Sequence, residues 1–199
     1  MRSSRNLLST LCVVAWIALA APGSVIAQDE GDSVQIASPP RALTDFELTD
    51  HLGQARKLSN FQGAPLLVFF GFANCPDVCP STLNELRMLK QSPQREIRRV
   101  QVAFISVDGD RDTPARLKAY LEPISRSFVG LTGSPAVVRR IAAQFSAVFF
   151  KGAADKNRTY QVQHTSQIYL VNAQGKLAAT FKNATNEQIR AAIADVSGE

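Results

Sequence analysis

Two cysteines, Cys75 and Cys79, lie four positions apart in the segment GFANCPDVCPS, and a proline directly follows each of them. An apolar run at residues 65–70 predicts a buried strand before the pair, and apolar residues at helical spacing predict a helix over residues 80–90. The first N–H groups of a helix are unpaired and carry the positive end of its dipole, so this position favours a thiolate over a thiol. The pair is therefore predicted to do chemistry.

Two such thiols can form a structural disulfide, act as a redox pair or bind a metal. A purely structural disulfide is the weakest interpretation, because loop closure stabilises least when the loop is very short. Side chains four apart on a helix have Cβ atoms about 5–6 Å apart, whereas a disulfide needs about 3.5–4.5 Å. The spacing permits both a redox pair and a metal site, and it slightly favours the metal.

The supply of soft donor atoms after residue 27 is small: two cysteines, His51, His164 and Met88. Met88 lies in the helix predicted after the cysteines and is expected to belong to the hydrophobic core, and His51 is expected to be an exposed histidine of a turn. His164 directly precedes a strand expected at residues 166–171, and the residues alone leave open whether it is a loop histidine or a ligand. Two thiolates and an imidazole suit copper or zinc, and because structural zinc takes four ligands, a set of three favours copper.

Three carboxylates accompany these donors. Asp77 lies between the cysteines, where it could tune the thiolates, contact a partner or cap the helix. Asp108 and Asp112 belong to the segment VDGDRDTP and are expected to order a loop near the site. Asp77 and Asp108 are the candidate outer partners of the metal ligands.

The N-terminal residues have the features of an export signal. Arg2 and Arg5 precede an apolar stretch at residues 7–21, which is shorter than the roughly 20 residues that span a bilayer. A cleaved signal peptide is therefore favoured over a retained anchor for residues 1–27. The protein is predicted to be exported, to the periplasm or the outer face of the inner membrane.

The remaining chain is predicted to hold a short linker and one domain. Residues 28–40 are polar and end in Ser-Pro-Pro, which is typical of a solvated linker, and residues 41–199 form the domain. The net charge of +5 falls to +3 without Arg2 and Arg5. So small an excess, with no long basic stretch, argues against a nucleic-acid partner.

Strand and helix patterns alternate along the predicted domain and then give way to a hairpin. The sequence predicts strands at residues 65–70, 100–107 and 128–131, helices at 80–90, 114–121 and 135–145, a hairpin formed by 168–171 and 177–181, and a last helix at 186–196. This order predicts an α/β fold: a thioredoxin-like mixed sheet flanked by helices.

Five segments together resemble the Sco/SenC family of copper-binding assembly proteins, over roughly residues 46–199. FGFANCPDVCPSTLNEL is similar to the cysteine signature of that family, and ISVDGDRDTPARLKAYL and FVGLTGSPAVVRRIA follow it in the family's order. QHTSQIYLVNAQGKL falls where the family carries its metal-binding histidine, and FELTDHLGQARKLSNFQG fits the start of the domain. The first four of these segments, in this order, are specific for the family, whereas a lone C-x-x-x-C motif is not.

The resemblance implies a thioredoxin-like domain that binds copper, as Cu(I) or Cu(II), through Cys75, Cys79 and His164. It implies a role in assembly of cytochrome c oxidase, by delivering copper to the dinuclear centre of subunit II or by reducing its thiols. The implied partners are that subunit or another copper protein and a thioredoxin-like reductant. The one membrane contact expected is through an N-terminal anchor, if residues 1–27 are retained.

Three interpretations of the function remain. The first is a metallochaperone, and the alternative is a thiol–disulfide oxidoreductase that reduces cysteines of a partner with Cys75 and Cys79 as its redox pair; a redox or copper sensor is a third and weaker reading. This sequence departs from the family at Gln163-His164-Thr165, where the family usually has Asp-His-Ser. The departure removes an acidic partner of the histidine but no ligand.

Overall fold

The computed structural model describes residues 33–156 and 160–197. Within them an eight-stranded sheet has the order β1-β10-β9-β4-β5-β6-β2-β3, and β7 pairs with β8 in a separate hairpin. The strands are β1 (Val34–Ala42), β2 (Glu47–Asp50), β3 (Ala55–Lys57), β4 (Leu66–Gly71), β5 (Gln101–Ser106), β6 (Phe128–Thr132), β7 (Phe149–Lys151), β8 (Val162–His164), β9 (Ile168–Val171) and β10 (Lys176–Phe181). The helices are α1 (Val78–Leu89), α2 (Arg95–Arg99), α3 (Pro114–Leu121), α4 (Pro135–Gln144) and α5 (Asn186–Ser197), with a 3-10 helix η1 (Leu58–Phe61).

The centre of the sheet is parallel and its flanks are antiparallel. β4 pairs in parallel with β5, and β5 with β6. β9, β10 and β1 extend the sheet antiparallel on one side, and β2 and β3 extend it on the other. Every residue of β4 is buried, as its continuous apolar run predicts for a strand covered on both faces.

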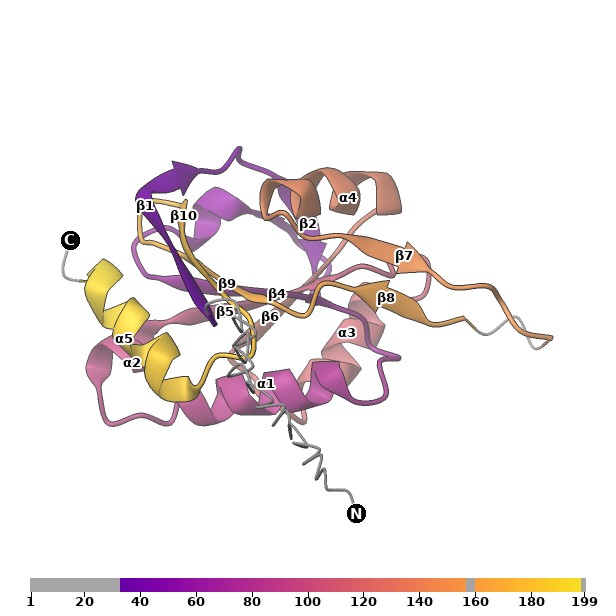
Figure 1. The fold of residues 1–199 in the computed structure, drawn as a ribbon. Coiled ribbons are helices and arrows are strands. Elements are labelled where there is room, and N and C mark those ends of the chain that lie inside the picture. Colours follow the sequence, from indigo (N-terminus) through magenta and orange to yellow (C-terminus); the bar gives the residue numbers. More distant parts are fainter. Residues whose placement is uncertain (1–32, 157–159, 198–199) are drawn as a thin grey trace, which may run out of the picture.

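Helices cover both faces of this sheet: α4 lies above it in Figure 1, and α1, α2, α3 and α5 lie below. Consecutive residues of β4 point to opposite faces. The ring of Phe69 lies against Phe104 on the α1 side, and the ring of Phe70 packs edge-on against Phe145 at the end of α4. The prediction of a mixed sheet flanked by helices is confirmed.

Two helices begin at the capping residues that the sequence indicates. The side chain of Thr113 accepts a hydrogen bond from the N–H of Arg116, and that of Ser134 accepts one from Val137. In each case a proline follows at the first helical position, where its missing N–H breaks no bond. The start of α3 matters most here, because it fixes the loop before it against the cysteine segment.

Residues 34–40 correct the predicted linker, because they form most of β1, paired with β10. The pairing register shifts between Ile36 and Arg41, which is where Pro39 and Pro40 lie. β1 is an edge strand, and proline is tolerated at edges and irregularities because few ladder hydrogen bonds are lost there. The Ser-Pro-Pro sequence therefore interrupts a strand instead of marking a linker, and residues 28–32 lie outside the described part.

The hairpin of β7 and β8 projects from the domain at the right of Figure 1 and was not predicted. Its register places Phe149 opposite His164, and Phe149 and Val162 are buried. At its base the N–H of Thr165 donates to the carbonyl of Val148 at 2.9 Å, and the N–H of Val148 donates to the Thr165 hydroxyl at 3.0 Å. The hairpin carries His164 back toward the sheet.

Across residues 33–156 and 160–197, no helix combines the length and the apolar character that crossing a membrane requires. The predicted signal peptide or anchor, residues 1–27, lies outside the described residues. Export therefore stays a prediction from the sequence.

Candidate metal centre

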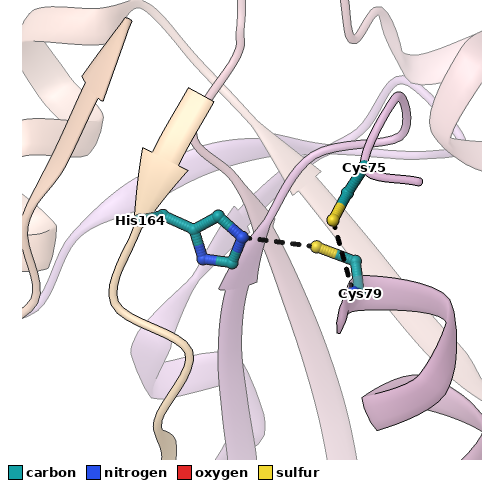
Figure 2. A group of neighbouring side chains, drawn as sticks. All are labelled: Cys75, Cys79 and His164. Carbon is teal, nitrogen blue, oxygen red and sulfur yellow. Dashed lines mark hydrogen bonds between the residues drawn. The ribbon is translucent and has the colours of Figure 1, made fainter. Parts of the chain in front are cut away.

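Three side chains from two distant segments converge beside the carboxyl end of β4 (Figure 2). Cys75 lies in the loop between β4 and α1, Cys79 lies in the first turn of α1, and His164 is the last residue of β8. One donor atom from each side chain lies within 4.8 Å of the other two. The Nε2 atom of His164 is 3.5 Å from the Sγ atom of Cys79. In the described part of the chain no other His, Cys, Asp and Glu side chains form such a group.

The start of α1 holds the two cysteines together. The N–H of Cys79 donates a hydrogen bond to the Sγ atom of Cys75, with an N–S distance of 3.4 Å. Cys79 is the second residue of α1, so its N–H is one of the donors without a partner inside the helix. Asp77 occupies the N-cap position, but its side chain makes no capping hydrogen bond. The sulfur of Cys75 therefore accepts a bond at the helix start that a capping side chain often accepts.

The two thiols differ sharply in exposure. Both are free, Cys75 is partly exposed, and Cys79 is 0% exposed. Burial raises the pKa of Cys79 well above its ordinary value, and the charges of Cys75 and Asp112 raise it further, against a main-chain hydrogen bond from Phe72. The prediction that the helix start gives a thiolate is wrong for Cys79, because desolvation outweighs the dipole. A cation bound at the sulfur would supply the positive charge that stabilises a buried thiolate.

The imidazole of His164 has one nitrogen free for a metal. Its Nδ1 atom lies 3.0 Å from the carbonyl oxygen of Thr165, and because a carbonyl only accepts, Nδ1 donates its proton and Nε2 keeps a lone pair. Burial lowers the pKa of His164, although the Thr165 bond raises it, so the neutral ring is favoured. The rings of Phe69 and Phe72 lie edge-on to it, at centroid distances of 6.1 and 5.8 Å. A main-chain carbonyl thus orients the ring as an acidic neighbour would.

Among the carboxylates, Asp112 is the one bonded to the cysteine loop. Its Oδ2 atom accepts from the N–H of Ala73 at 2.9 Å and from the hydroxyl of Ser106 at 2.6 Å. Burial raises the pKa of Asp112, and these hydrogen bonds oppose that rise. Asp112 orders the loop, as the sequence predicts. Asp77 is exposed, and its part in the site stays a prediction.

Asp108 is fully buried and is bonded away from the three donors. Its Oδ1 atom accepts from the hydroxyl of Tyr160 at 2.6 Å, and its Oδ2 atom pairs with the Nε atom of Arg111 at 2.5 Å. Tyr160 precedes β8, the strand that ends at His164. The carboxylate of Asp108 therefore contacts the hairpin and not the three donors. Nothing in the sequence pattern pairs Asp108 with a tyrosine so far along the chain.

Tyr120 is a residue near the site that the sequence reasoning missed. Its ring lies 5.7 Å from that of Phe104, and its buried hydroxyl has no hydrogen-bond partner among the described residues. Phe104 in turn lies beside Gly71 and the Cys79 sulfur, and burial raises the pKa of Tyr120, as do the charges of Cys79 and Cys75. An aromatic residue at helical spacing in α3 is typical of a core position, so the sequence offers no signal for it.

Two other soft donors lie away from the cysteines. Met88 was predicted to be a core residue, and this is wrong: it is 48% exposed, because the buried stripe of α1 runs through Leu83, Leu86 and Leu89. His51 lies in the turn after β2, as predicted, but it is half-buried and its Nδ1 atom accepts from the N–H of Gly130 at 3.2 Å. His51 does not belong to the group of converging donors.

Comparison with known proteins gives a consistent result for sequence and fold. The SCO1/SenC family model matches residues 34–197, and the match starts at the first residue of β1. The mitochondrial SCO2 homologue of Bos taurus is 32% identical over 182 residues, covering 88% of this chain and 66% of that protein. The chain spans about two thirds or less of the length of such mitochondrial SCO2 relatives.

Solved structures with the same fold include two Sco proteins. ScoI of Bradyrhizobium japonicum, solved with copper bound, is 34% identical with a TM-score of 0.69, covering 79% of this chain and 98% of that one. BsSco, described with a disulfide switch and as a member of the Sco family of cytochrome c oxidase assembly proteins, is 26% identical with a TM-score of 0.66, covering 82% and 98%. These likenesses confirm the thioredoxin-like class, and with the match over residues 34–197 they establish that the chain belongs to the SCO1/SenC family.

Proposed function

We propose that this protein is a copper chaperone that holds one copper ion between the sulfur atoms of Cys75 and Cys79 and the Nε2 atom of His164. The observation that carries the proposal is the convergence of these three soft donors within 4.8 Å. Thiolate and imidazole ligands suit copper, and three of them are enough for it. The copper-bound structure of a related ScoI supports copper as the ion.

Each donor has a role that follows from its surroundings. Cys75 is the more exposed thiol, so it is the first to meet an incoming ion or partner. Cys79 keeps its proton until a cation compensates the buried charge, so loading releases that proton. His164 supplies a neutral nitrogen that is already oriented. Two thiolates alone can hold Cu(I), and the imidazole adds the donor that matters most for Cu(II).

The proposed cycle begins with reduction of a Cys75–Cys79 disulfide by an external thioredoxin-like dithiol. Two electrons and two protons pass to the pair, and the two thiols of the dithiol become its own disulfide. Copper then binds to the two sulfurs and the imidazole as the thiol protons leave. Thiolates of the receiving protein replace the ligands one at a time, so the ion is never released to water.

Copper titration of single variants against a competing chelator tests this proposal. Cys75→Ser and Cys79→Ser are expected to abolish tight binding of copper in both oxidation states. His164→Ala is expected to lower the affinity for Cu(II) at least about tenfold, because even the loss of a hydrogen-bond partner of a ligand has an effect of that size. Its effect on the affinity for Cu(I) should be smaller. Cu(II) bound to the wild type should show strong sulfur-to-copper charge transfer.

His51→Ala is the matched control, because it removes the other histidine of the chain, which lies away from the thiols. This variant should bind copper as the wild type does. If His164→Ala also matched the wild type in both oxidation states, the three-donor site would be wrong.

A second function, thiol–disulfide exchange, is favoured by the position of the two sulfurs. They lie within 4.8 Å of each other, and Cys75 already contacts the backbone of Cys79. A small movement of the loop would bring them to bonding distance, about 2.05 Å, and the disulfide switch described for BsSco supports this reading. If exchange is the main function, His164→Ala should leave its rate unchanged.

The proposed partners and location follow from the same reading. The receiving site is the dinuclear copper centre of cytochrome c oxidase subunit II or the site of another copper protein, and the reductant is a thioredoxin-like dithiol. Export to the periplasm or the outer face of the inner membrane rests on residues 1–27. Fusion of these residues to a reporter that is active only outside the cytoplasm tests the export step.

A further inference from the structure

His164 is carried by an element that is too small to fix its own position. β7 and β8 have three residues each, and among the described residues they pair only with each other. A two-stranded hairpin is marginally stable in water by itself. The distance from the imidazole to the thiols must therefore be set by contacts between the hairpin and the rest of the domain.

The β8 side of the hairpin is held by a closed ring of three residues. The hydroxyl of Tyr160 donates to Asp108 at 2.6 Å, and Asp108 pairs with the Nε atom of Arg111 at 2.5 Å. Arg111 completes the ring, because its Nη1 atom donates to the carbonyl of Tyr160 at 3.0 Å. The guanidinium also lies over the Tyr160 ring, with its Cζ atom 3.7 Å from the centroid. Tyr160 is thus held through its hydroxyl, its ring and its main-chain carbonyl.

The β7 side is held by the same loop. Lys151, the last residue of β7, forms an ion pair with Asp110, and its Nζ atom lies 5.0 Å from the centroid of the Tyr160 ring. Both strands are therefore tied to residues 108–111 at the end away from the base of the hairpin. This ion pair is the more exposed of the two attachments and contributes less.

The loop that holds the hairpin also holds the thiols. The N–H groups of Arg111 and Asp112 both donate to the carbonyl of Asp108 at 2.9 Å, which makes residues 108–112 a compact turn. Asp112 in turn binds the N–H of Ala73, two residues before Cys75. The same turn therefore contacts both the hairpin that carries His164 and the loop that carries Cys75.

We propose that Asp108, Arg111 and Tyr160 form a clamp that positions His164 at the thiols, and that Tyr160 and Arg111 are positioning residues for copper binding. The proposal rests on the copper site described above and adds the residues that act through the imidazole. With the clamp open, the hairpin keeps its base contacts and the exposed Lys151–Asp110 ion pair, which contributes less, so Nε2 spends less time within reach of an ion held by the sulfurs. The effect should fall on Cu(II), where the imidazole matters most.

Tyr160→Phe is the sharpest test, because it removes only the hydroxyl and keeps the ring beneath Arg111. Titrated with Cu(II) against a chelator, this variant should bind about tenfold more weakly than the wild type, and the nitrogen coupling in its Cu(II) spectrum should weaken. Cu(I) affinity should hardly change. Tyr169→Phe is the matched control: it also removes a hydroxyl from a buried tyrosine, bonded to Gln167 at 3.2 Å on the α4 side of the sheet. It should leave copper binding unchanged.

A double-mutant cycle separates positioning from general damage to the fold. If Tyr160 acts through the imidazole, Tyr160→Phe should have no further effect on Cu(II) affinity in a His164→Ala background. An equal loss in both backgrounds would overturn the proposal. Should His164→Ala weaken Cu(II) binding while Tyr160→Phe does not, the copper site stands and the clamp alone is refuted.

Arg111→Lys provides a second variant that keeps the positive charge. A lysine cannot reach Asp108 and the carbonyl of Tyr160 together, so it should reproduce the Tyr160→Phe effect on Cu(II). A Cu(II) affinity and spectrum equal to those of the wild type would count against the clamp. Thermal unfolding of each variant, measured without copper, shows whether any loss of binding exceeds the loss of stability.

Discussion

At the scale of single residues, the two thiols of the site have opposite environments although only three residues separate them in the sequence. Cys75 is partly exposed and accepts a hydrogen bond from the start of α1, whereas Cys79 is buried beneath the end of β4. Burial keeps Cys79 protonated, and the same burial removes water from any ion that its sulfur binds. One thiol is therefore suited to exchange and the other to retention.

This difference predicts unequal alkylation of the reduced, metal-free protein. Cys75 should react with iodoacetamide at least about tenfold faster than Cys79, because Cys75 is partly exposed, whereas Cys79 is buried and its raised pKa disfavours its thiolate. Peptide mass mapping over a time course measures both rates and separates them from Cys12. The single-thiol variants give the control: Cys79→Ser should react quickly at Cys75, and Cys75→Ser slowly at Cys79. The reverse order would show that the buried thiol is the reactive one.

The sequence predicted the three candidate metal donors but not their environment. Cys75 and Cys79 follow from their spacing, and His164 follows from the resemblance to a family, since a histidine before a strand is ambiguous by itself. The pKa of Cys79 was predicted in the wrong direction, because the helix start is visible in the sequence and the packing of the end of β4 over the sulfur is not. Tyr120 was missed for the same reason.

At the scale of elements, the end of β4 sets how deeply Cys79 lies. A Cβ atom added at Gly71 would be 2.6 Å from the Phe104 ring and 2.7 Å from the Cys79 sulfur. Gly71→Ala should therefore lower the free energy of unfolding by about 1–3 kcal/mol, because Phe104 is 0% exposed and has no room to move. It should also weaken copper binding, since the sulfur must shift. Urea unfolding and chelator competition measure the two effects.

Gly130→Ala is the control for that substitution. Its Cβ atom would lie 2.7 Å from Leu121 and 3.2 Å from Leu117, so it should also be destabilising, but these contacts lie between β6 and α3. Copper affinity should stay at the wild-type level. Equal losses of copper affinity in both glycine variants would mean that stability, and not the position of the Cys79 sulfur, decides binding.

Elements with strong periodicity or capping signals were predicted well, and short ones were not. β4, α3 and α4 follow from an apolar run and from Thr or Ser caps before proline. Most of β1 falls in the predicted linker because two prolines in a polar segment are typical of one, and the pairing with β10 shows that they lie in an edge strand. β7 and β8 are too short for a pattern, and they are stabilised by tertiary contacts.

At the scale of the whole molecule, buried charges that are paired decide how the protein responds to acid. Asp50 is 0% exposed and is the last residue of β2, directly before the turn to β3. Its Oδ1 atom accepts from the N–H groups of Leu52 and Gln54 at 2.9 Å, and its Oδ2 atom pairs with Arg56 at 2.9 Å. Burial would raise the pKa of Asp50, but the hydrogen bonds and Arg56 outweigh it and hold the pKa below its ordinary value.

This shift predicts a loss of stability in acid that a single substitution can isolate. Because the pKa of Asp50 is lower in the folded than in the unfolded state, its stabilisation is complete above roughly pH 4 and is lost as the pH falls through the folded-state pKa. Asp50→Asn should lower the free energy of unfolding by about 1–3 kcal/mol at neutral pH, and its deficit relative to the wild type should narrow in acid. Urea unfolding at several pH values measures the difference, which is the proper readout because the net charge of +5 grows in acid and destabilises both proteins. Asp77→Asn, which alters an exposed carboxylate without a capping bond, should match the wild type throughout. An Asp50→Asn deficit that stays constant or widens on acidification would contradict the assignment.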